Sequence, residues 1–324
     1  MNLKENSIEI IKPISRFYLY GFKEYFNSFV KLLNKNSLPN AILLSGAKGI
    51  GKSTFIYHFI NYILSREEKN SYSIENLSIS EKNNSFKLIN ENMHPNFFLL
   101  DNVNSSENIK IENVRKLLNF INKSTYSKNL KIVFIDNSEN LNINSSNALL
   151  KTLEEPPNNT YFFINHNNST FLKDTIKSRC VNFNIHFSIN QKKEIFTALI
   201  NEYNIKFEEN YSNVLLSFLS PGIILSNITN LNDLNFNSSN DLLSCIMILI
   251  EKLNQSKDSN LFNFLNLFIE KFYYDLSLND TVNINYYFFK KSKILYLIND
   301  MKRYNLDKKN LLLSITNILQ SEKK

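Results

Sequence analysis

The chain has 324 residues, a formal net charge of +7 and 43% hydrophobic residues, which suits a globular protein of two or three domains and excludes a disordered one. Its two cysteines, Cys180 and Cys245, have no short spacing, so they predict neither a disulfide framework nor a zinc site. The first residues lack the apolar core and cleavage site of a signal peptide, and the longest apolar stretches are too short to span a bilayer. We therefore expect a cytoplasmic protein.

The excess of basic residues does not by itself predict nucleic-acid binding. No tight Lys/Arg cluster stands out, and Asn, Lys and Ile are abundant while Gly and Trp are scarce, as an AT-rich coding sequence would produce. Helix-turn-helix, zinc-finger and RNP-like aromatic motifs are not recognisable. We expect any contact with DNA to be made to its phosphates and to weaken steeply with salt.

The first ninety residues predict a strand between two helices, followed by a polar segment. Residues 22–36 space their apolar residues three and four apart, as an amphipathic helix does. Residues 41–46 predict a short buried strand, and residues 55–64 predict a second helix. Residues 66–93 are rich in Asn, Ser, Glu and Lys, which indicates a surface insertion.

The next hundred residues alternate between strands and helices. Strands are predicted at 96–101, 131–136, 160–165 and 180–185, and the run at 131–136 is apolar throughout, which favours an interior position in a parallel sheet. A helix is predicted at 111–124, and another follows Asn144 or Ser145 as its N-cap and stops at Pro156-Pro157. This alternation predicts a three-layer α/β domain that ends near residue 187.

The remaining sequence is helical in pattern. Residues 188–229 predict a small helical unit, and residues 230–324 predict a helical C-terminal domain without internal repeats. The longest helical patterns there are found at 241–255, 261–276 and 288–305.

A complete phosphate-binding loop, GAKGIGKS, occupies residues 46–53 between a predicted strand and a predicted helix. Three of the chain's five glycines, Gly46, Gly49 and Gly51, lie within it, and such a loop directs backbone N–H groups at phosphate oxygens. Lys52 is expected to reach the β- and γ-phosphates, and the Ser53 hydroxyl is expected to hold Mg²⁺. This pattern predicts a nucleotide-binding protein.

The strand at 131–136 ends on Asp136, which we expect to be the second Mg²⁺ anchor, acting through water. Hydrolysis also requires a group that accepts a proton from the attacking water or aligns it. Asn137 can orient water but cannot accept a proton at neutral pH, and Glu139 is expected to point elsewhere. Nucleotide binding is thus predicted to be intact and hydrolysis to be compromised.

Several motifs together resemble bacterial clamp-loader subunits of the AAA+ class. They are KIVFIDNSENL at 131–141, NALLKTLEEPP at 147–157 and SRC at 178–180. The stretches MHPNFFLLD at 93–101 and IKIENVRKLLNFIN at 109–122 narrow the resemblance to delta-prime subunits of DNA polymerase III. LPNAILLSGAKGIGKST at 38–54 and SPG at 220–222 also fit, so that the resemblance runs from about residue 20 to 225.

The resemblance implies an AAA+ nucleotide-binding domain at 1–187, a helical lid at 188–229 and a collar domain at 230–324. The collar of such proteins joins a five-subunit ring with motor gamma/tau subunits and a delta subunit, and the ring loads a sliding clamp onto primed DNA. ATP or ADP with Mg²⁺ would bind at the loop and Asp136, and Arg179 of SRC matches an arginine finger that acts on the neighbouring subunit's nucleotide. The nucleotide-binding positions are Gly46, Gly49, Gly51, Lys52, Ser53, Thr54 and Asp136.

The sequence departs from the family's pattern in four places. Many relatives carry a four-cysteine zinc module after the loop helix, and residues 66–93 have no cysteine, so no zinc is expected. Active loader ATPases have Glu where Asn137 stands, an arginine where Ile223 stands, and threonine or asparagine at the γ-phosphate-sensing position, which the resemblance gives to His166. These departures favour a stator that donates Arg179 and has no, or very weak, ATPase activity of its own.

Three other readings of the sequence are possible. The motor subunit of the same loader predicts the four cysteines, an Asp-Glu pair and the lid arginine, all of which this chain lacks. A free-standing P-loop enzyme, such as a nucleotide kinase, gives LLKTLEEPP and SRC no role. A plain DNA-binding protein lacks a recognisable motif.

Overall fold

The computed structural model describes residues 10–101, 109–123, 130–205, 215–227, 242–255, 260–280, 282–304 and 306–320. The chain divides into two compact units. One comprises Ile8–Ile205 and Ser220–Ser226, and the other comprises Met1–Ser7, Lys206–Leu219 and Asn227–Lys324. Within the described ranges, no helix is long and apolar enough to cross a membrane.

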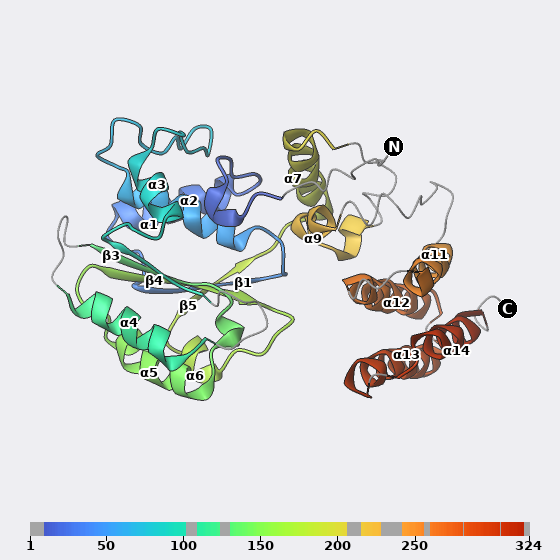
Figure 1. The fold of residues 1–324 in the computed structure, drawn as a ribbon. Helices are drawn as coiled ribbons and strands as arrows, with labels where there is room; N and C mark the ends of the chain where they lie inside the picture. Colours follow the sequence, from blue (N-terminus) through green and yellow to red (C-terminus); the bar gives the residue numbers. More distant parts are fainter. Residues whose placement is uncertain are drawn as a thin grey trace, which may run out of the picture. The chain divides into compact units, whose positions relative to one another are not determined.

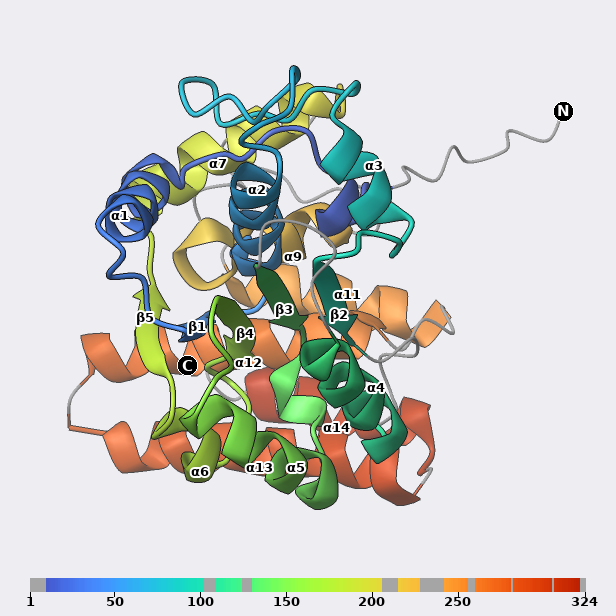
Figure 2. The same ribbon diagram turned by 90° about the vertical axis from the view of Figure 1, so that its left-hand side faces the viewer.

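The first unit is built on a parallel sheet of five strands in the order β2-β3-β4-β1-β5, which can be followed across Figure 2. All of the strands predicted from the sequence are present: β1 (Ala41–Gly46), β2 (Phe97–Leu100), β3 (Lys131–Ile135), β4 (Thr160–Asn167) and β5 (Val181–Ile185). The interior position predicted for β3 is confirmed, because it pairs with β2 on one side and β4 on the other. Strand β4 separates β1 from β3, although it follows both in sequence.

Helices cover both faces of this sheet (Figure 1). On one face lie α1 (Lys23–Asn34), α2 (Lys52–Leu64) and α3 (Asn84–Asn90), and on the other lie α4 (Ile111–Asn122), α5 (Ile143–Glu154) and α6 (Asp174–Lys177). Parallel strands need crossover connections, and these connections place helices on the two faces. The predicted three-layer α/β fold, a parallel sheet with helices on both faces, is confirmed.

Aromatic side chains hold α1 and α2 against the sheet. Phe26, Phe29, Phe55 and Phe59 are fully buried and contact one another edge-to-face, with ring centroids 5.1 to 6.2 Å apart in the inter-helix pairs. Burying one such ring stabilises the fold by roughly 2 to 3 kcal/mol. Because α2 begins at Lys52, this packing also fixes the end of the phosphate-binding loop.

The segment at 66–93 is not the surface insertion that its polar composition indicates. Its apolar side chains lie in the same core as α1 and α2, and Tyr72 stacks on Phe26 with ring centroids 5.0 Å apart. The buried members are Tyr72, Leu77, Ile79, Phe86 and Ile89. They are spaced irregularly in sequence, so no periodic pattern reveals that they share one core.

The N-cap of α5 also differs from the prediction. The helix begins at Ile143, and the side chain of Asn142, neither Asn144 nor Ser145, accepts the capping hydrogen bond from Ser145 N at 2.8 Å. Ser145 is instead buried, and its hydroxyl donates to Ile109 O at 2.7 Å. The end of α5 at Glu154, before Pro156-Pro157, agrees with the prediction.

Two helices of the predicted lid belong to the first unit, α7 (Ile189–Glu202) and α9 (Pro221–Ser226). A capping box between Ser188 and Gln191 begins α7. The second unit contains α11 (Leu242–Gln255), α12 (Asn260–Asn279), α13 (Ile284–Tyr304) and α14 (Lys308–Gln320). Helix α12 packs against α11 and α13, and α14, which was not predicted, packs against the same two helices. The domain boundaries at 187 and 229 stay predictions.

Candidate functional site

The predicted strand, loop and helix around GAKGIGKS are confirmed. Strand β1 ends at Gly46, α2 begins at Lys52, and Gly51 is its N-cap, with a left-handed φ of 103°. The loop borders a cavity of about 400 Å³, and Thr54 also lines it. A helix N-terminus opening into a cavity is a favourable place for an anion, because its first N–H groups have no partners within the helix.

Lys52 is held inside the loop. Its side chain is buried, and Nζ donates to Gly46 O at 3.0 Å, to Ala47 O at 2.9 Å and to Asn167 Oδ1 at 3.0 Å. Burial lowers the pKa of Lys52 to about 8, although the carboxylates of Glu139 and Asp136 act in the opposite direction. A phosphate placed beside Nζ would supply the negative charge that this buried ammonium lacks.

Ser53 and Asp136 meet, as the predicted Mg²⁺ site requires. Ser53 Oγ lies 3.2 Å from both carboxylate oxygens of Asp136, and Asn165 Nδ2 donates to Ser53 Oγ at 3.0 Å and to Asp136 Oδ1 at 2.7 Å. Burial raises the pKa of Asp136, while the hydrogen bonds from Asn165, Asn137 N and Ser53 act against that rise.

The donor set around Asp136 fits Mg²⁺. Hydroxyl and carboxylate oxygens are the ligands this ion prefers, and Asn165 Oδ1 is a further buried oxygen without a hydrogen-bond partner. The described residues contain no group of three or more His, Cys, Asp or Glu that could hold a metal ion. Mg²⁺ at Ser53 and Asp136 would therefore depend on the phosphates of a bound nucleotide.

Asn137 borders the cavity in an unusual backbone conformation. Its φ is 52°, in the left-handed region that asparagine tolerates better than most residues. Its Nδ2 donates to Asp101 Oδ1 at 3.1 Å at the end of β2, and its N–H donates to Asp136 Oδ1 at 3.0 Å. The amide side chain is thus tied to Asp101, and no carboxylate stands at this position.

Strand β4 supplies Asn165 and Asn167 to the site, and the sequence interpretation missed both. Side chains alternate along a strand, so His166 lies on the other face; it is buried and does not line the cavity. The assignment of the sensing position to His166 is therefore wrong, because Asn167 is the β4 residue that contacts Lys52. The alternation of Asn, His and Asn at the end of the predicted strand is the signal that could have identified them.

Glu139 does not point away from the site, as the sequence interpretation expected. Its Oε1 accepts a hydrogen bond from Asn167 Nδ2 at 2.5 Å, and its Oε2 is buried without a partner. A carboxylate thus lies one side chain away from Lys52, although it does not line the cavity.

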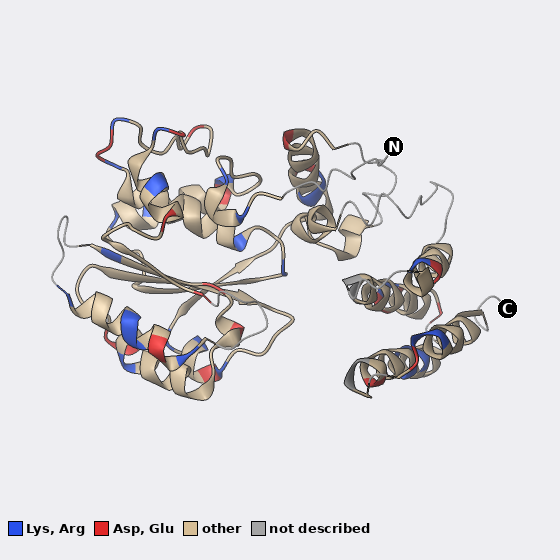
Figure 3. Ribbon diagram, in the orientation of Figure 1, with Lys and Arg blue, Asp and Glu red and all other residues tan. Residues whose placement is uncertain are grey.

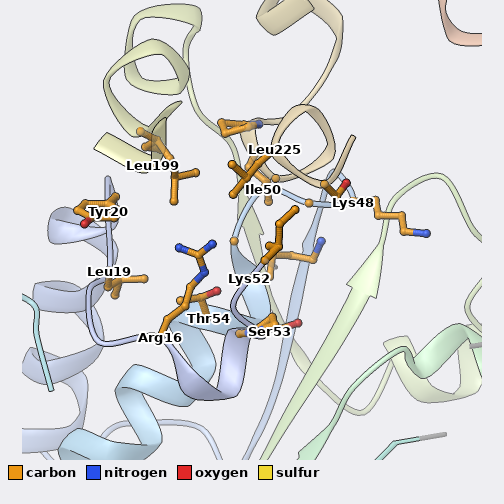
Figure 4. A pocket seen from close by; sticks show the side chains of 18 of the residues that line it. Arg16, Leu19, Tyr20, Lys48, Ile50, Lys52, Ser53, Thr54, Leu199 and Leu225 are labelled. Atoms are coloured by element: carbon orange, nitrogen blue, oxygen red, sulfur yellow. The ribbon is translucent and has the colours of Figure 1, made fainter. Parts of the chain in front are cut away.

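The part of the cavity away from the phosphate loop is lined mainly by apolar side chains, with Arg16 among them (Figure 4). Its walls come from the N-terminal segment and from α7 and α9, and they include Ile10, Ile11, Leu19, Ile195, Leu199 and Leu225. Arg16, which the sequence did not single out, is buried there and bonds to Glu202 Oε2 at 3.2 Å and to Tyr203 OH at 2.9 Å. An apolar cavity that continues into a phosphate loop suits a nucleoside attached to phosphates.

Arg179 lies near the amino-terminal ends of the strands, whereas the phosphate-binding loop lies at their carboxyl ends. It precedes β5, whose first residue, Val181, pairs with Ile42, whereas the loop follows Gly46 at the carboxyl end of β1. At about 3.3 Å per strand residue, this separates Arg179 from its own loop by roughly 15 to 20 Å. Its guanidinium bonds to Glu154 Oε2 at 3.2 Å and to Thr175 O at 3.0 Å, so that SRC and LLKTLEEPP are joined by an ion pair.

The surface around this ion pair is mixed in charge. Figure 3 shows Lys and Arg interspersed with Asp and Glu along α4, α5 and α6. The net charge of +7 is therefore not gathered on these three helices.

Residues 21–188 match the family described as DNA polymerase III, delta subunit. Among curated proteins, none matches the chain significantly. Similar solved structures include a DNA polymerase III gamma subunit-related protein from Thermotoga maritima, at 16% identity and a TM-score of 0.40, covering 92% of this chain and 99% of that one.

Two further similar structures also come from Thermotoga maritima. The Holliday junction branch migration motor RuvB shows 13% identity and a TM-score of 0.43, covering 76% of this chain and 74% of its own. Domain III of the replication initiation protein DnaA shows 13% identity and a TM-score of 0.39, covering 74% and 95%. The sequence identities and TM-scores of these three structures are too low to support a conclusion about function.

Proposed function

The chain belongs to the DNA polymerase III delta subunit family, whose match spans just over half of its 324 residues, and we propose that it is the delta-prime subunit of a clamp loader. In this role it is a stator: it assembles with motor gamma/tau and delta subunits in a ring that loads a sliding clamp onto primed DNA. Residues 188–229 act as its lid and residues 230–324 as its collar.

The position of Arg179 carries this proposal. A guanidinium at the amino-terminal ends of the strands is too far from the phosphate-binding loop, at their carboxyl ends, to act on the nucleotide of its own chain. It is partly exposed, so a neighbouring subunit can approach it. Directed at a neighbour's γ-phosphate, it would neutralise the negative charge that develops there during hydrolysis.

The loop of this chain is suited to hold a nucleotide rather than to cleave it. Its N–H groups and Lys52 would bind the phosphates, and Ser53 and Asp136 would hold Mg²⁺, which neutralises phosphate charge when bound. Asn137 cannot take a proton from water, and its amide is engaged by Asp101. Ile223 places no positive charge near the γ-phosphate. We infer that ATP or ADP has a structural role here.

Removing the finger tests the proposal. In a reconstituted loader, Arg179→Ala should abolish turnover at the one site that this chain serves and lower the clamp- and DNA-stimulated ATPase of the whole complex. Glu154→Ala is the matched control, because it removes the exposed ion pair, worth at most about 1 kcal/mol, and leaves the guanidinium in place. The isolated chain should hydrolyse no measurable ATP.

Two results would contradict the proposal. One is an Arg179→Ala complex with the same ATPase rate as the Glu154→Ala complex, which would make the arginine a structural ion pair. The other is purification of the tagged chain from its cells without any other loader subunit, as judged by mass spectrometry.

The position of Glu139 favours a second candidate, the ATP-hydrolysing motor subunit of the same loader. Its carboxylate contacts Asn167, which contacts Lys52, and one of its oxygens has no partner. This candidate predicts that Glu139→Gln lowers ATP turnover in the reconstituted loader, and an unchanged rate in that variant excludes it.

A further inference from the structure

The turn that begins α9 is bonded directly to the phosphate-binding loop. Ser220 Oγ donates to Lys48 O at 2.5 Å, and Gly222 N donates to Gly49 O at 3.0 Å. Ser220 is 3% exposed, so water does not compete for its hydrogen bond. The segments are more than 170 residues apart in sequence.

The contact is so close that it requires glycine on both sides. A Cβ at Gly222 would lie 2.4 Å from Gly49 O, although the backbone of Gly222 itself suits other residues. A Cβ at Gly49 would lie 2.7 Å from Ser220 Oγ and 2.9 Å from Ile223 N, at a φ of +73°. Gly49 is therefore needed by the turn as well as by the shape of the loop.

These bonds determine where the loop's N–H groups point. In a planar trans peptide the carbonyl and the following N–H point in opposite directions. Anchoring the carbonyls of Lys48 and Gly49 to the turn therefore aims the N–H groups of Gly49 and Ile50 away from it, and the Ile50 N–H donates to Ala47 O at 3.4 Å within the loop. Both residues line the cavity.

We propose that Ser220 and Gly222 are positioning residues, a latch that keeps the phosphate-binding loop in the conformation that receives phosphates. The latch also couples α9 to nucleotide binding through the loop backbone. This coupling does not require a charged side chain on α9, where Ile223 stands. The second statement rests on the proposed function of the loop as a nucleotide site, whereas the first does not.

Gly222→Ala and Ser220→Ala test the latch in the full-length chain. The first introduces a methyl group against Gly49 O, and the second removes one hydrogen bond. Ser28→Ala is the control, because its exposed hydroxyl donates to Glu24 O within α1 and Ser28 does not line the cavity. Hydrogen exchange of residues 46–54 reports on the loop without nucleotide, and calorimetry with MgADP reports on binding.

We expect loop exchange to become about fivefold faster in Ser220→Ala and at least tenfold faster in Gly222→Ala, with MgADP affinity falling by similar factors. The control should match the unsubstituted chain in both measurements. Faster exchange only within α9, with the loop unchanged, would reduce Ser220 and Gly222 to packing residues and overturn the latch.

The two proposals fail in different ways. If the unsubstituted chain does not bind MgADP, the nucleotide-binding part of the proposed function is lost, while loop exchange still decides the latch. If it binds MgADP and both variants bind equally well with unchanged loop exchange, only the latch is lost. If Gly222→Ala does not fold, as judged by circular dichroism, the loop exchange and MgADP affinity of the smaller Ser220→Ala change decide whether the latch exists.

Discussion

Replacing Lys52 with methionine should make the free chain more stable and remove nucleotide binding. Methionine keeps the length and apolar stem of the side chain but carries no charge into a buried position. The gain is reduced because Gly46 O, Ala47 O and Asn167 Oδ1 each lose a hydrogen bond. The substitution therefore separates two effects of the buried ammonium: the stability that it costs the free chain and the binding of phosphate that it provides.

The magnitude follows from the pKa of Lys52, which burial lowers from 10.5 to about 8. Between these two values the unfolded chain binds more protons than the folded chain, so the Lys52 contribution to stability rises with pH. At about 1.4 kcal/mol for each pKa unit, the rise amounts to roughly 3 kcal/mol, and below pH 8 the full penalty is present. The stability advantage of Lys52→Met should thus be largest near pH 7 and vanish or reverse by pH 10.5.

Urea unfolding of both proteins at pH values from 7 to 10.5 measures this difference. Both contain the same second unit and the same other titrating groups, so subtraction leaves the contribution of Lys52. Lys48→Met is the control, since that side chain is exposed on the same loop and its loss should change stability little. A stability difference between Lys52→Met and the unsubstituted chain that stays constant over this pH range would refute the reasoning.

Two further substitutions test how polar groups hold helix ends in place. Lys131→Met should destabilise the chain by about 2 kcal/mol in urea unfolding, because its ammonium bonds to carbonyls at the end of α4, and an unchanged midpoint would speak against that cap. These carbonyls belong to Phe120, Ile121 and Lys123. Glu68→Gln should cost about 1 kcal/mol and speed hydrogen exchange in α3, because the carboxylate accepts bonds from Asn84 N and Ser85 N at 2.9 and 3.0 Å. Equal exchange in the two proteins would show that the charge of Glu68 is not needed there.

Local patterns predicted much of the first unit. Apolar runs bounded by polar residues located all five strands, and the glycine loop between β1 and α2 was complete in sequence. Because parallel strands end at the same edge, Asp136 at the end of β3 could be expected near Ser53. The same reasoning places Arg179, which precedes β5, at the opposite ends of the strands from the phosphate-binding loop.

Contacts that depend on strand order and on distant segments were decided only by the tertiary structure. Strand β4 lies between β1 and β3, which brings Asn165 to Ser53 and Asp136 and brings Asn167 to Lys52. No local pattern encodes that order, because it results from how the whole sheet packs. The bond from Gly222 to Gly49 likewise joins residues that only folding brings together, so Gly49 is required by the contact with α9 as well as by the shape of the loop.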